Sequence, residues 1–477
     1  MKKIAILLVS LALASCESWL DVKEADRMMA EDVYKLERET NKALNGLYLQ
    51  LTSESLYAKN LSCGMLDILG QRYLSGSEHA YNTIQTYSFE ESATKSTLLT
   101  TWSAAYKTIA NCNEFLDRID NNKEHFTQAH YLQYKGEAIA IRTLLHFDML
   151  RLFGPVYGPD TQNEEAVPYY DQVYRSAAEF KTASMMARIL LSDIASAIEY
   201  LKEDPILSGN VKNPNSVRFF TDYRHLRMNI YAAWVLKARI HHYLGTPLNV
   251  QEAYKITSSL LAGKNPADEA ATCNFPMVIR SVDHNDGSKT AEMVYDPEII
   301  FGIHNLDRPD LHKANFSTDL ENKRILAGGV DYVNNMYDIS ADIRRKMWVL
   351  YPDRDFYAFV RFAGGTATDF TNQLQCIIRL GEVYLIAAET APDAVNKRKY
   401  LEALRLSRAL AVDNTIGYSD EQLGKLIEDE YIREFAGEGQ YFYYAKRNNL
   451  AAVKAQNGNQ VAPKYVMPLP ESEIDLR

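Results

Sequence analysis

Apolar residues recur at helical spacing along most of this chain. In successive segments they fall at positions i, i+3, i+4 and i+7, which places them on one face of an α-helix. The segments are residues 33–51, 98–119, 131–153, 177–201, 228–244, 250–261, 377–391, 398–411 and 421–435. Such a chain buries its apolar surface by packing helix against helix, so the sequence predicts a mainly α protein.

Two of these segments are each followed closely by another. Segment 228–244 turns at residues 245–247 into segment 250–261, and segment 377–391 turns at Pro392 into segment 398–411. Each pair spans about 34 residues, which is the period of a tetratricopeptide repeat, although any antiparallel helix hairpin has similar spacing. The chain has 477 residues, enough for an extended solenoid. We therefore expect a tetratricopeptide-like helical solenoid.

Segment 131–153 is apolar on nearly every face, so we expect it to lie between other helices. Its charged residues include Glu137, Arg142, Asp148 and Arg151. Asp148 and Arg151 stand at i and i+3 and can pair. The favoured interpretation of these charges is structural ion pairing inside the solenoid.

The first residues are typical of an export signal. Three residues, Met1-Lys2-Lys3, form a short basic region, and residues 4–14 are apolar but too few to span a membrane. The run ends in Leu13-Ala14-Ser15-Cys16, which resembles the lipobox of bacterial lipoproteins, where the chain is cut before the cysteine and the thiol carries a lipid. We expect a signal peptide at residues 1–15, lipidation of Cys16, and a tether over residues 16–27.

Four further cysteines, Cys63, Cys112, Cys273 and Cys376, lack the spacing of a zinc site. Structural cysteines are the favoured interpretation. An export compartment also permits a disulfide among them, which is the alternative.

Two irregular regions, residues 65–95 and 261–375, interrupt the helical segments. Both are rich in Gly, Asp, Asn and aromatic residues, and the whole chain carries 31 Tyr, 17 Phe and 4 Trp. Loops held on a rigid frame are where ligand contacts usually lie, and aromatic rings can stack on a ligand. The candidate ligand-binding residues are Tyr73, Tyr81, Trp348, Tyr351 and Tyr357. Trp102, in contrast, belongs to an apolar helical stripe and is expected in the core.

The motifs of several enzyme classes are absent from the sequence. There is no H-E-x-x-H helix, no G-x-S-x-G elbow, no phosphate-binding G-x-x-x-x-G-K-[ST] loop and no EF-hand calcium loop. The histidines His146, His241 and His242 have no partner at metal-ligand spacing. We expect no catalytic residue, metal or cofactor, although a carboxylate pair of a glycoside hydrolase could lie anywhere in the sequence.

The charge balance argues against nucleic acid as a partner. The chain has 52 Lys and Arg against 62 Asp and Glu, a net charge of −10, and no long basic block to neutralise phosphates.

Several motifs together give the chain an end-to-end resemblance to the SusD/RagB family. The most specific is Gly136-Glu-Ala through Phe147-Asp-Met-Leu-Arg-Leu-Phe-Gly154. The other matching segments are Cys16-Glu-Ser-Trp-Leu-Asp-Val, Ala43-Leu-Asn-Gly-Leu-Tyr, Trp102-Ser-Ala-Ala-Tyr, Asp342-Ile-Arg-Arg, Arg379-Leu-Gly-Glu-Val-Tyr-Leu-Ile-Ala-Ala-Glu and Met467-Pro-Leu-Pro-Glu-Ser-Glu-Ile. One departure is that Tyr441 and Tyr444 stand where the family often has Arg and Asp.

This resemblance implies four tetratricopeptide-like helix pairs around a loop-rich lobe that carries ligand specificity. It implies a lipoprotein at the cell surface, anchored in the outer membrane, that delivers an oligosaccharide, or in some members a peptide, to a SusC-like TonB-dependent transporter. We expect helices with one loop over residues 28–263, a ligand lobe over 264–375, and a helix pair with a tail over 376–477. A surface glycoside hydrolase and a purely structural repeat scaffold are the competing hypotheses.

Overall fold

The structure is a computed structural model that describes residues 33–173, 177–208, 218–273, 275, 295–363, 370–410 and 415–474. The predicted signal peptide, Cys16 and the predicted tether lie outside these residues.

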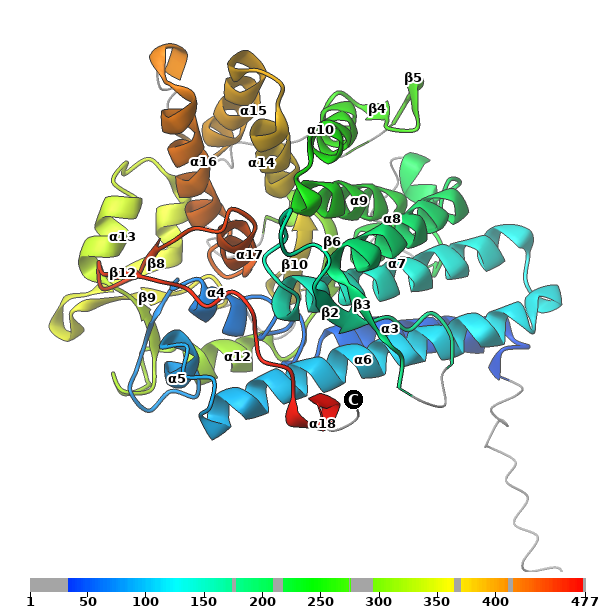
Figure 1. The fold of residues 1–477 in the computed structure, drawn as a ribbon, viewed down its shortest axis with the longest axis horizontal. Helices are drawn as coiled ribbons and strands as arrows, with labels where there is room; N and C mark the ends of the chain where they lie inside the picture. The colour runs from blue at the N-terminus through cyan, green and yellow to red at the C-terminus, as the bar shows by residue number, and fades with distance from the viewer. Residues whose placement is uncertain are drawn as a thin grey trace, which may run out of the picture.

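Helices packed side by side form most of the molecule (Figure 1). The first group is α3 (Glu37–Leu51), α6 (Ser92–Asp120), α7 (Gln128–Phe153), α8 (Ala183–Tyr200), α9 (Ile230–Leu244) and α10 (Pro247–Leu261). Successive members from α6 to α10 pack against one another, and α10 then packs against α14. The second group is α14 (Leu380–Thr390), α15 (Ala394–Ser407), α16 (Asp420–Glu434) and α17 (Gln440–Arg447). The predicted mainly α, tetratricopeptide-like solenoid is confirmed, and we call these two groups the helical frame.

The ends of the frame helices follow local sequence signals. The side chain of Asn229 accepts a hydrogen bond from the backbone N–H of Ala232 (3.0 Å) at the start of α9. Ser419 and Gln422 form a reciprocal capping box at the start of α16. Helix α9 ends at Gly245, whose φ of +63° is a conformation that glycine adopts without strain.

Helix α7 occupies the middle of the frame, as its apolar pattern predicts. It is buried on all sides over most of its length, and Leu144, Leu145 and Phe147 have no exposed surface. Asp148 and Arg151 form the predicted ion pair within it. Trp102 of α6 is also buried and packs edge-on against Phe153 (4.8 Å between ring centroids), which confirms its place in the core.

The two regions predicted to be irregular meet in one small antiparallel sheet. Strand β1 (Leu74–Ser75), from the first region, pairs with β7 (Leu326–Gly328), from the second, and the order continues through β9 (Phe356–Phe359) to β8 (Trp348–Tyr351). These strands are too short to show an alternating pattern in the sequence, so the sequence predicts only irregular structure here.

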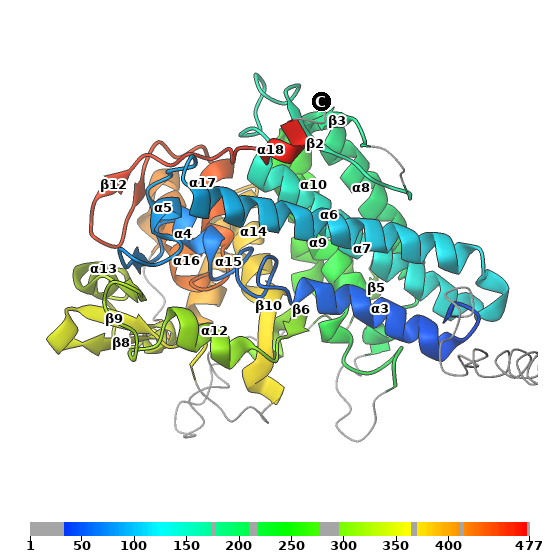
Figure 2. The same cartoon turned by 90° about the horizontal axis from the view of Figure 1, so that it is seen from below.

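Short helices surround this sheet: α4 (Met65–Leu69), α5 (Asn82–Gln85), α12 (Arg308–Asn315) and α13 (Val330–Met336). We call the sheet and these helices the lobe. Figure 2 shows α12, α13, β8 and β9 at one end of the molecule, with α3 and α7 extending toward the other.

A second pair of strands joins the lobe to the frame. Strand β6 (Ile299–His304) pairs with β10 (Leu374–Arg379), which runs directly into α14. The predicted helix at 377–391 therefore begins as a strand, because its first residues, Ile377 and Ile378, belong to β10. The hairpin of β11 (Val453–Lys454) and β12 (Gln460–Val461) follows α17.

The remaining elements are short. They are β2 (Glu165–Pro168), β3 (Phe180–Thr182), β4 (Lys264–Asn265), β5 (Asp268–Thr272), α18 (Glu471–Ile474) and single 3-10 turns at Lys123–His125, Pro205–Ser208, Arg224–Leu226, Asp296–Glu298, Ile343–Met347, Pro352–Arg354, Phe370–Gln373 and Thr415–Gly417.

The four described cysteines are unbridged. Cys63, Cys112 and Cys376 are buried, and this burial raises the pKa of each thiol to about 12. These three residues are structural thiols, which confirms the favoured interpretation for them.

Candidate ligand-binding site

The aromatic residues predicted to bind a ligand lie mainly inside the lobe. Tyr73 has no exposed surface, and Trp348 is 6% exposed. The two rings are neighbours, with centroids 6.2 Å apart, and both pack against Phe359. The structure thus brings these two candidates together in the core of the lobe, where both rings are covered by protein.

Two more candidates, Tyr357 and Tyr81, are also buried, and the hydroxyl group of each forms a hydrogen bond within the protein. The Tyr357 hydroxyl donates to the side chain of Asn334 (2.7 Å), and the Tyr81 hydroxyl donates to the side chain of Asn60 (2.5 Å). Tyr351 alone among the five candidates is half-buried, and its ring stacks on Phe356. Ligand contact by the five stays a prediction, and for the four buried rings it requires the lobe to open.

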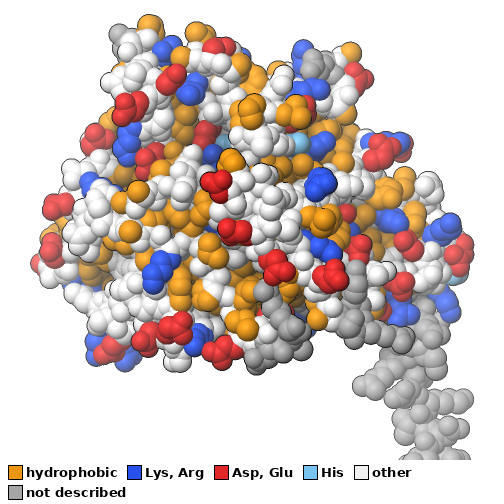
Figure 3. All heavy atoms as spheres, in the orientation of Figure 1, with side chains coloured by type: hydrophobic (Ala, Val, Ile, Leu, Met, Phe, Trp, Pro, Cys, Tyr) orange, Lys and Arg blue, Asp and Glu red, His pale blue; other side chains and the backbone are white. Residues whose placement is uncertain are grey.

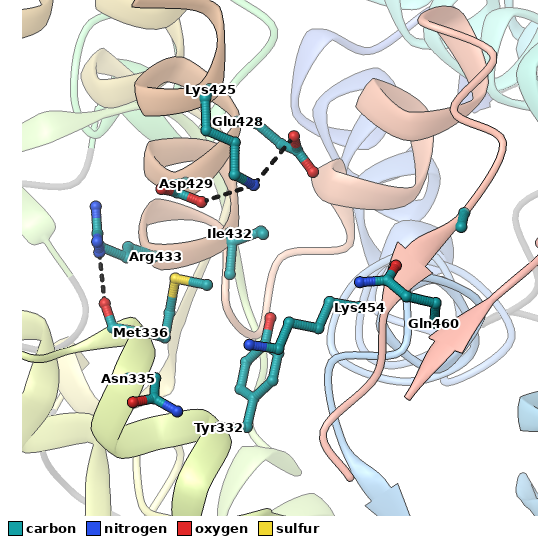
Figure 4. A pocket seen from close by; sticks show the side chains of 11 residues that line it. Tyr332, Asn335, Met336, Lys425, Glu428, Asp429, Ile432, Arg433, Lys454 and Gln460 are labelled. Carbon is teal, nitrogen blue, oxygen red and sulfur yellow. Dashed lines mark hydrogen bonds and ion pairs between the residues drawn. The ribbon is translucent and has the colours of Figure 1, made fainter. Parts of the chain in front are cut away.

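A pocket of about 470 Å³ lies where the lobe meets the frame (Figure 4). Three elements form its walls: α13 of the lobe, α16 of the frame and the β11–β12 hairpin. The lining residues are Tyr332, Asn335, Met336, Lys425, Glu428, Asp429, Ile432, Arg433, Ala452, Lys454 and Gln460. The pocket therefore combines an apolar part, from Met336 and Ile432, with many hydrogen-bonding groups.

The charged residues of the α16 wall are largely paired with one another. Lys425 contacts both Glu428 (3.4 Å) and Asp429 (3.2 Å), as Figure 4 shows. Arg433 donates to the carbonyl oxygen of Met336 (2.7 Å) and to Glu430 (3.0 Å), which ties α16 to α13. This wall offers a ligand both carboxylate acceptors and an ammonium donor.

Beneath the pocket, Arg72 connects its walls. Arg72 is buried, and its guanidinium donates to the Tyr332 hydroxyl and to the carbonyl oxygen of Lys454 (2.8 Å). It also lies 4.3 Å from the ring centroid of Tyr441, whose hydroxyl donates to Glu428 (3.1 Å). One side chain thus contacts α13 and the hairpin directly and reaches α16 through Tyr441.

A buried network of charges holds the lobe and the frame in register behind the pocket. Its centre is Glu434 of α16, which has no exposed surface and accepts hydrogen bonds from Arg344 (2.9 Å), Arg379 and Arg408 (3.0 Å). Burial disfavours the charged form of Glu434, but the Arg408 and Arg379 guanidinium groups outweigh it and hold the pKa of Glu434 well below its ordinary value.

Two of the arginines that contact Glu434 are also paired with other carboxylates. Arg344, in the predicted Asp342-Ile-Arg-Arg motif, also contacts Asp342 (2.8 Å) and Glu430 (2.7 Å). Arg408 is held as well by Glu298, the residue that precedes β6 (2.6 Å). The motif residues singled out in the sequence therefore serve to fix the geometry of the junction.

The pocket residues were not among the predicted site residues. Tyr332 belongs to the aromatic-rich second region, but nothing in the sequence distinguished it from its neighbours. Lys425, Glu428 and Asp429 lie on the polar face of a predicted helix, where charges usually mark contact with water. Only the approach of the hairpin turns that face into a wall.

The pocket shows no sign of a metal centre. Within the described ranges, no group of three or more His, Cys, Asp or Glu side chains is placed to hold a metal ion. The lining residues of the pocket can instead bind a ligand through hydrogen bonds and charged groups.

Comparison with known proteins places this architecture in a family. Residues 18–207 match a family model described as "Starch-binding associating with outer membrane", and residues 332–472 match the model of the SusD family. The chain belongs to the SusD/RagB family. A search of curated proteins finds no match for it.

Solved SusD-like structures share the fold over nearly the whole chain. A SusD superfamily protein from Bacteroides thetaiotaomicron is 20% identical with a TM-score of 0.68, covering 92% of this chain and 97% of the other. A SusD-like carbohydrate binding protein from Bacteroides vulgatus is 18% identical with a TM-score of 0.65, covering 92% and 96%. A laminarin binding SusD-like protein is 14% identical with a TM-score of 0.65, covering 92% and 97%.

Among the described helices, none combines the length and the apolar composition needed to cross a membrane.

Proposed function

We propose that this SusD/RagB protein binds nutrient oligosaccharides at the cell surface and delivers them to a SusC-like TonB-dependent transporter in the outer membrane. The observation that carries the proposal is the pocket between α13, α16 and the hairpin, in a chain of this family. Membership alone does not select a ligand site, whereas the pocket supplies one of suitable size and polarity.

The open polar groups of the pocket suit a sugar. The side chains of Asn335 and Gln460 are exposed and form no hydrogen bond to other described residues, so their amides are available to hydroxyl groups. Each amide can both donate and accept, as a sugar hydroxyl can. Met336 and Ile432 add apolar surface for the C–H groups of a ring.

The pocket carboxylates are poorly arranged for hydrolysis. A glycosidase places its two carboxyl groups on either side of the scissile bond, about 5 to 9 Å apart. Glu428 and Asp429 are consecutive residues of one helix, and both contact the same ammonium group of Lys425. This arrangement supports binding over bond cleavage.

Binding and hydrolysis can be separated in one experiment on the purified full-length protein in detergent. We expect retention on gels containing a recognised polysaccharide, with no release of oligosaccharide from it. The double change Asn335→Ala and Gln460→Ala should weaken binding about tenfold or more, because each lost hydrogen bond contributes about 1 kcal/mol. Gln128→Ala, an exposed glutamine at the start of α7, is the matched control. Released sugar, or no retention on any polysaccharide, would contradict the proposal.

The lipid anchor is tested by Cys16→Ala. The chain has a net charge of −10, which opposes adsorption to anionic surfaces, so loss of the lipid should release the protein from membranes. Fractionation in high salt measures this, and a mutant that still pellets with membranes would contradict a lipid anchor.

The transporter is tested by affinity purification of the tagged protein from its native membrane. A stable complex should bury more than about 1,000 Å² and survive mild detergent. We expect a large β-barrel protein to copurify, and recovery of the lipoprotein alone would contradict the proposed delivery role.

A further inference from the structure

The charges around the pocket are not evenly compensated. Lys425 contacts two carboxylates, those of Glu428 and Asp429. Arg433 contacts Glu430, which also pairs with two buried arginines, Arg344 and Arg405. Two further cations, Arg72 and Lys454, contact the same pocket residues. In the part of the chain that the structure describes, neither forms an ion pair with a carboxylate.

The contacts of Arg72 are neutral groups. Its guanidinium donates to the carbonyl oxygens of Gly70 (2.6 Å) and Lys454 (2.8 Å) and to the Tyr332 hydroxyl. Asp67 influences Arg72 electrostatically from beyond ion-pair distance. A buried cation without a close carboxylate gives a positive potential that is screened little by water.

Lys454 adds a second positive charge at the same place. Its ammonium lies 5.9 Å from the ring centroid of Tyr332, and the Arg72 guanidinium lies 5.3 Å from that centroid. Both cations lie over the electron-rich face of the Tyr332 ring, so less of that face is open for stacking against a neutral sugar. The Tyr332 end of the pocket therefore favours an anionic group.

This local charge contrasts with the rest of the molecule. The chain carries a net charge of −10, and acidic side chains recur along the lower edge of the face drawn in Figure 3. A surplus of positive charge at one end of a pocket in such a protein attracts an anion from solution over a short range.

We infer that the pocket selects saccharides that carry a carboxylate, such as oligomers of hexuronic acids. The carboxylate binds beside Lys454 and Tyr332, while the amides of Asn335 and Gln460 and the carboxylates of the α16 wall bind hydroxyl groups. This inference rests on the proposed function, because it names the ligand class of the same pocket.

The test uses pairs of sugars in which each carboxylate is replaced by its neutral methyl ester. Trisaccharides of galacturonic acid and of glucuronic acid, and the neutral methyl ester of each, are titrated into the full-length protein in detergent by calorimetry. We expect at least one acid to bind about tenfold or more tightly than its ester at low salt, since hydrogen bonds to charged groups are the stronger ones. The preference should shrink in 0.5 M salt, because the Debye length there lies between about 3 and 10 Å and the attraction between exposed charges is screened beyond it.

Variants assign the preference to the pocket. Lys454→Gln should abolish the difference between acid and ester, and Lys454→Arg should retain it. Lys313→Gln removes an exposed lysine from α12 and should leave the difference unchanged. Lys454 is exposed, so these changes test binding in a folded protein.

Three outcomes would overturn the inference while leaving saccharide binding in place. The first is that neither acid binds more tightly than its ester, and the second is a preference that survives Lys454→Gln. The third is binding of a neutral maltotriose or laminaritriose while both acids fail, which leaves glycan binding standing and removes only the acidic ligand class. If no saccharide of any kind binds, the proposed function falls and this inference falls with it.

Discussion

The core of α7 and the junction behind the pocket are equally buried but are held together differently. In α7, buried side chains such as Leu144, Leu145 and Phe147 pack against neighbouring helices. At the junction, the buried side chains are arginines and glutamates centred on Glu434. Burial by itself therefore does not show what stabilises a region of this protein.

The two kinds of core respond differently to the loss of one member. Removing a buried apolar group costs its transfer free energy and leaves a cavity, which neighbours can partly fill. Removing one member of a buried charge network leaves its partners charged and without water, which packing cannot relieve. The apolar core around α7 should therefore tolerate single changes better than the junction does.

The largest effect is expected for Glu434→Gln. The change leaves Arg344, Arg379 and Arg408 facing a neutral side chain, and breaking a buried pair in this way costs about 3 to 5 kcal/mol or more of unfolding free energy. Urea denaturation measures the loss, and hydrogen exchange should show β6 opening before α7. Glu421→Gln, at an exposed position of the same helix, is the control. A loss below about 1 kcal/mol would end the distinction between the two cores.

Trp348→Ala comes next, because Trp348 belongs to the lobe but is packed like the frame. Its ring lies 4.8 Å from that of Phe359, and a Cβ on Gly328 would come within 2.7 Å of it. We expect a loss of about 4 kcal/mol from this large-to-small change, seen as a lowered melting temperature. Tyr351→Ala, on the same strand but half-buried, should cost much less. An unchanged melt with weaker ligand binding would instead make Trp348 a binding surface.

Leu145→Ala tests the frame itself. Leu145 has no exposed surface, and truncation should cost about 3 kcal/mol in urea denaturation. Leu49→Ala, on α3 with 72% of its surface exposed, should change stability by less than about 0.5 kcal/mol. If Leu145→Ala cost more than Glu434→Gln, the comparison would be reversed.

Most of the frame could be predicted from the sequence. The predicted segment 131–153 is α7 (Gln128–Phe153), and 421–435 is α16 (Asp420–Glu434). These helices are long and have one or more apolar faces, so their periodicity is a local property of the chain. The predicted start of the helix at 377–391 is wrong, because a buried strand and a buried helix both show continuous apolar residues and the sequence does not distinguish them.

The candidate site could not be predicted in the same way. Its walls come from Tyr332, Lys425 and Lys454, which are far apart in sequence, and the approach of a two-stranded hairpin completes it. Aromatic content led to Tyr73 and Trp348, but an aromatic ring buries as readily in a lobe core as it binds a sugar. Tertiary packing decides which loops lie next to one another, and the periodicity of apolar residues in the sequence carries no information about it.

A pH-dependent effect is expected at Asp67, a buried carboxyl that joins the lobe to the frame. It accepts hydrogen bonds from the backbone N–H groups of Gly437 (2.7 Å) and Gly439 (3.0 Å), in the turn between α16 and α17. Both glycines have positive φ, and a Cβ on Gly439 would come within 2.7 Å of Leu66. Asp67 of the lobe thus fixes a turn of the frame that only glycine can form without strain.

The ionisation of Asp67 gives this link a pH dependence of known sign. Burial raises the pKa of Asp67 to about 7, from an ordinary value of 3.8. Between these values the folded protein binds more protons than the unfolded chain, so the stabilising contribution is complete below about pH 4 and is lost as pH rises to about 7. At about 1.4 kcal/mol per pKa unit, a rise from 3.8 to about 7 corresponds to a loss on the order of 4 kcal/mol, and the value of about 7 already includes the hydrogen bonds that favour the charged form.

Asp67→Asn should therefore flatten the stability profile between pH 4 and 7, measured by urea denaturation at intervals across that range. Asp331→Asn, at an exposed position of α13, should leave the profile as it is. Equal slopes in all three proteins would show that Asp67 does not titrate in this range. A flatter slope in Asp67→Asn alone would mean that the contact between lobe and frame, and not the helical core, makes this protein sensitive to pH.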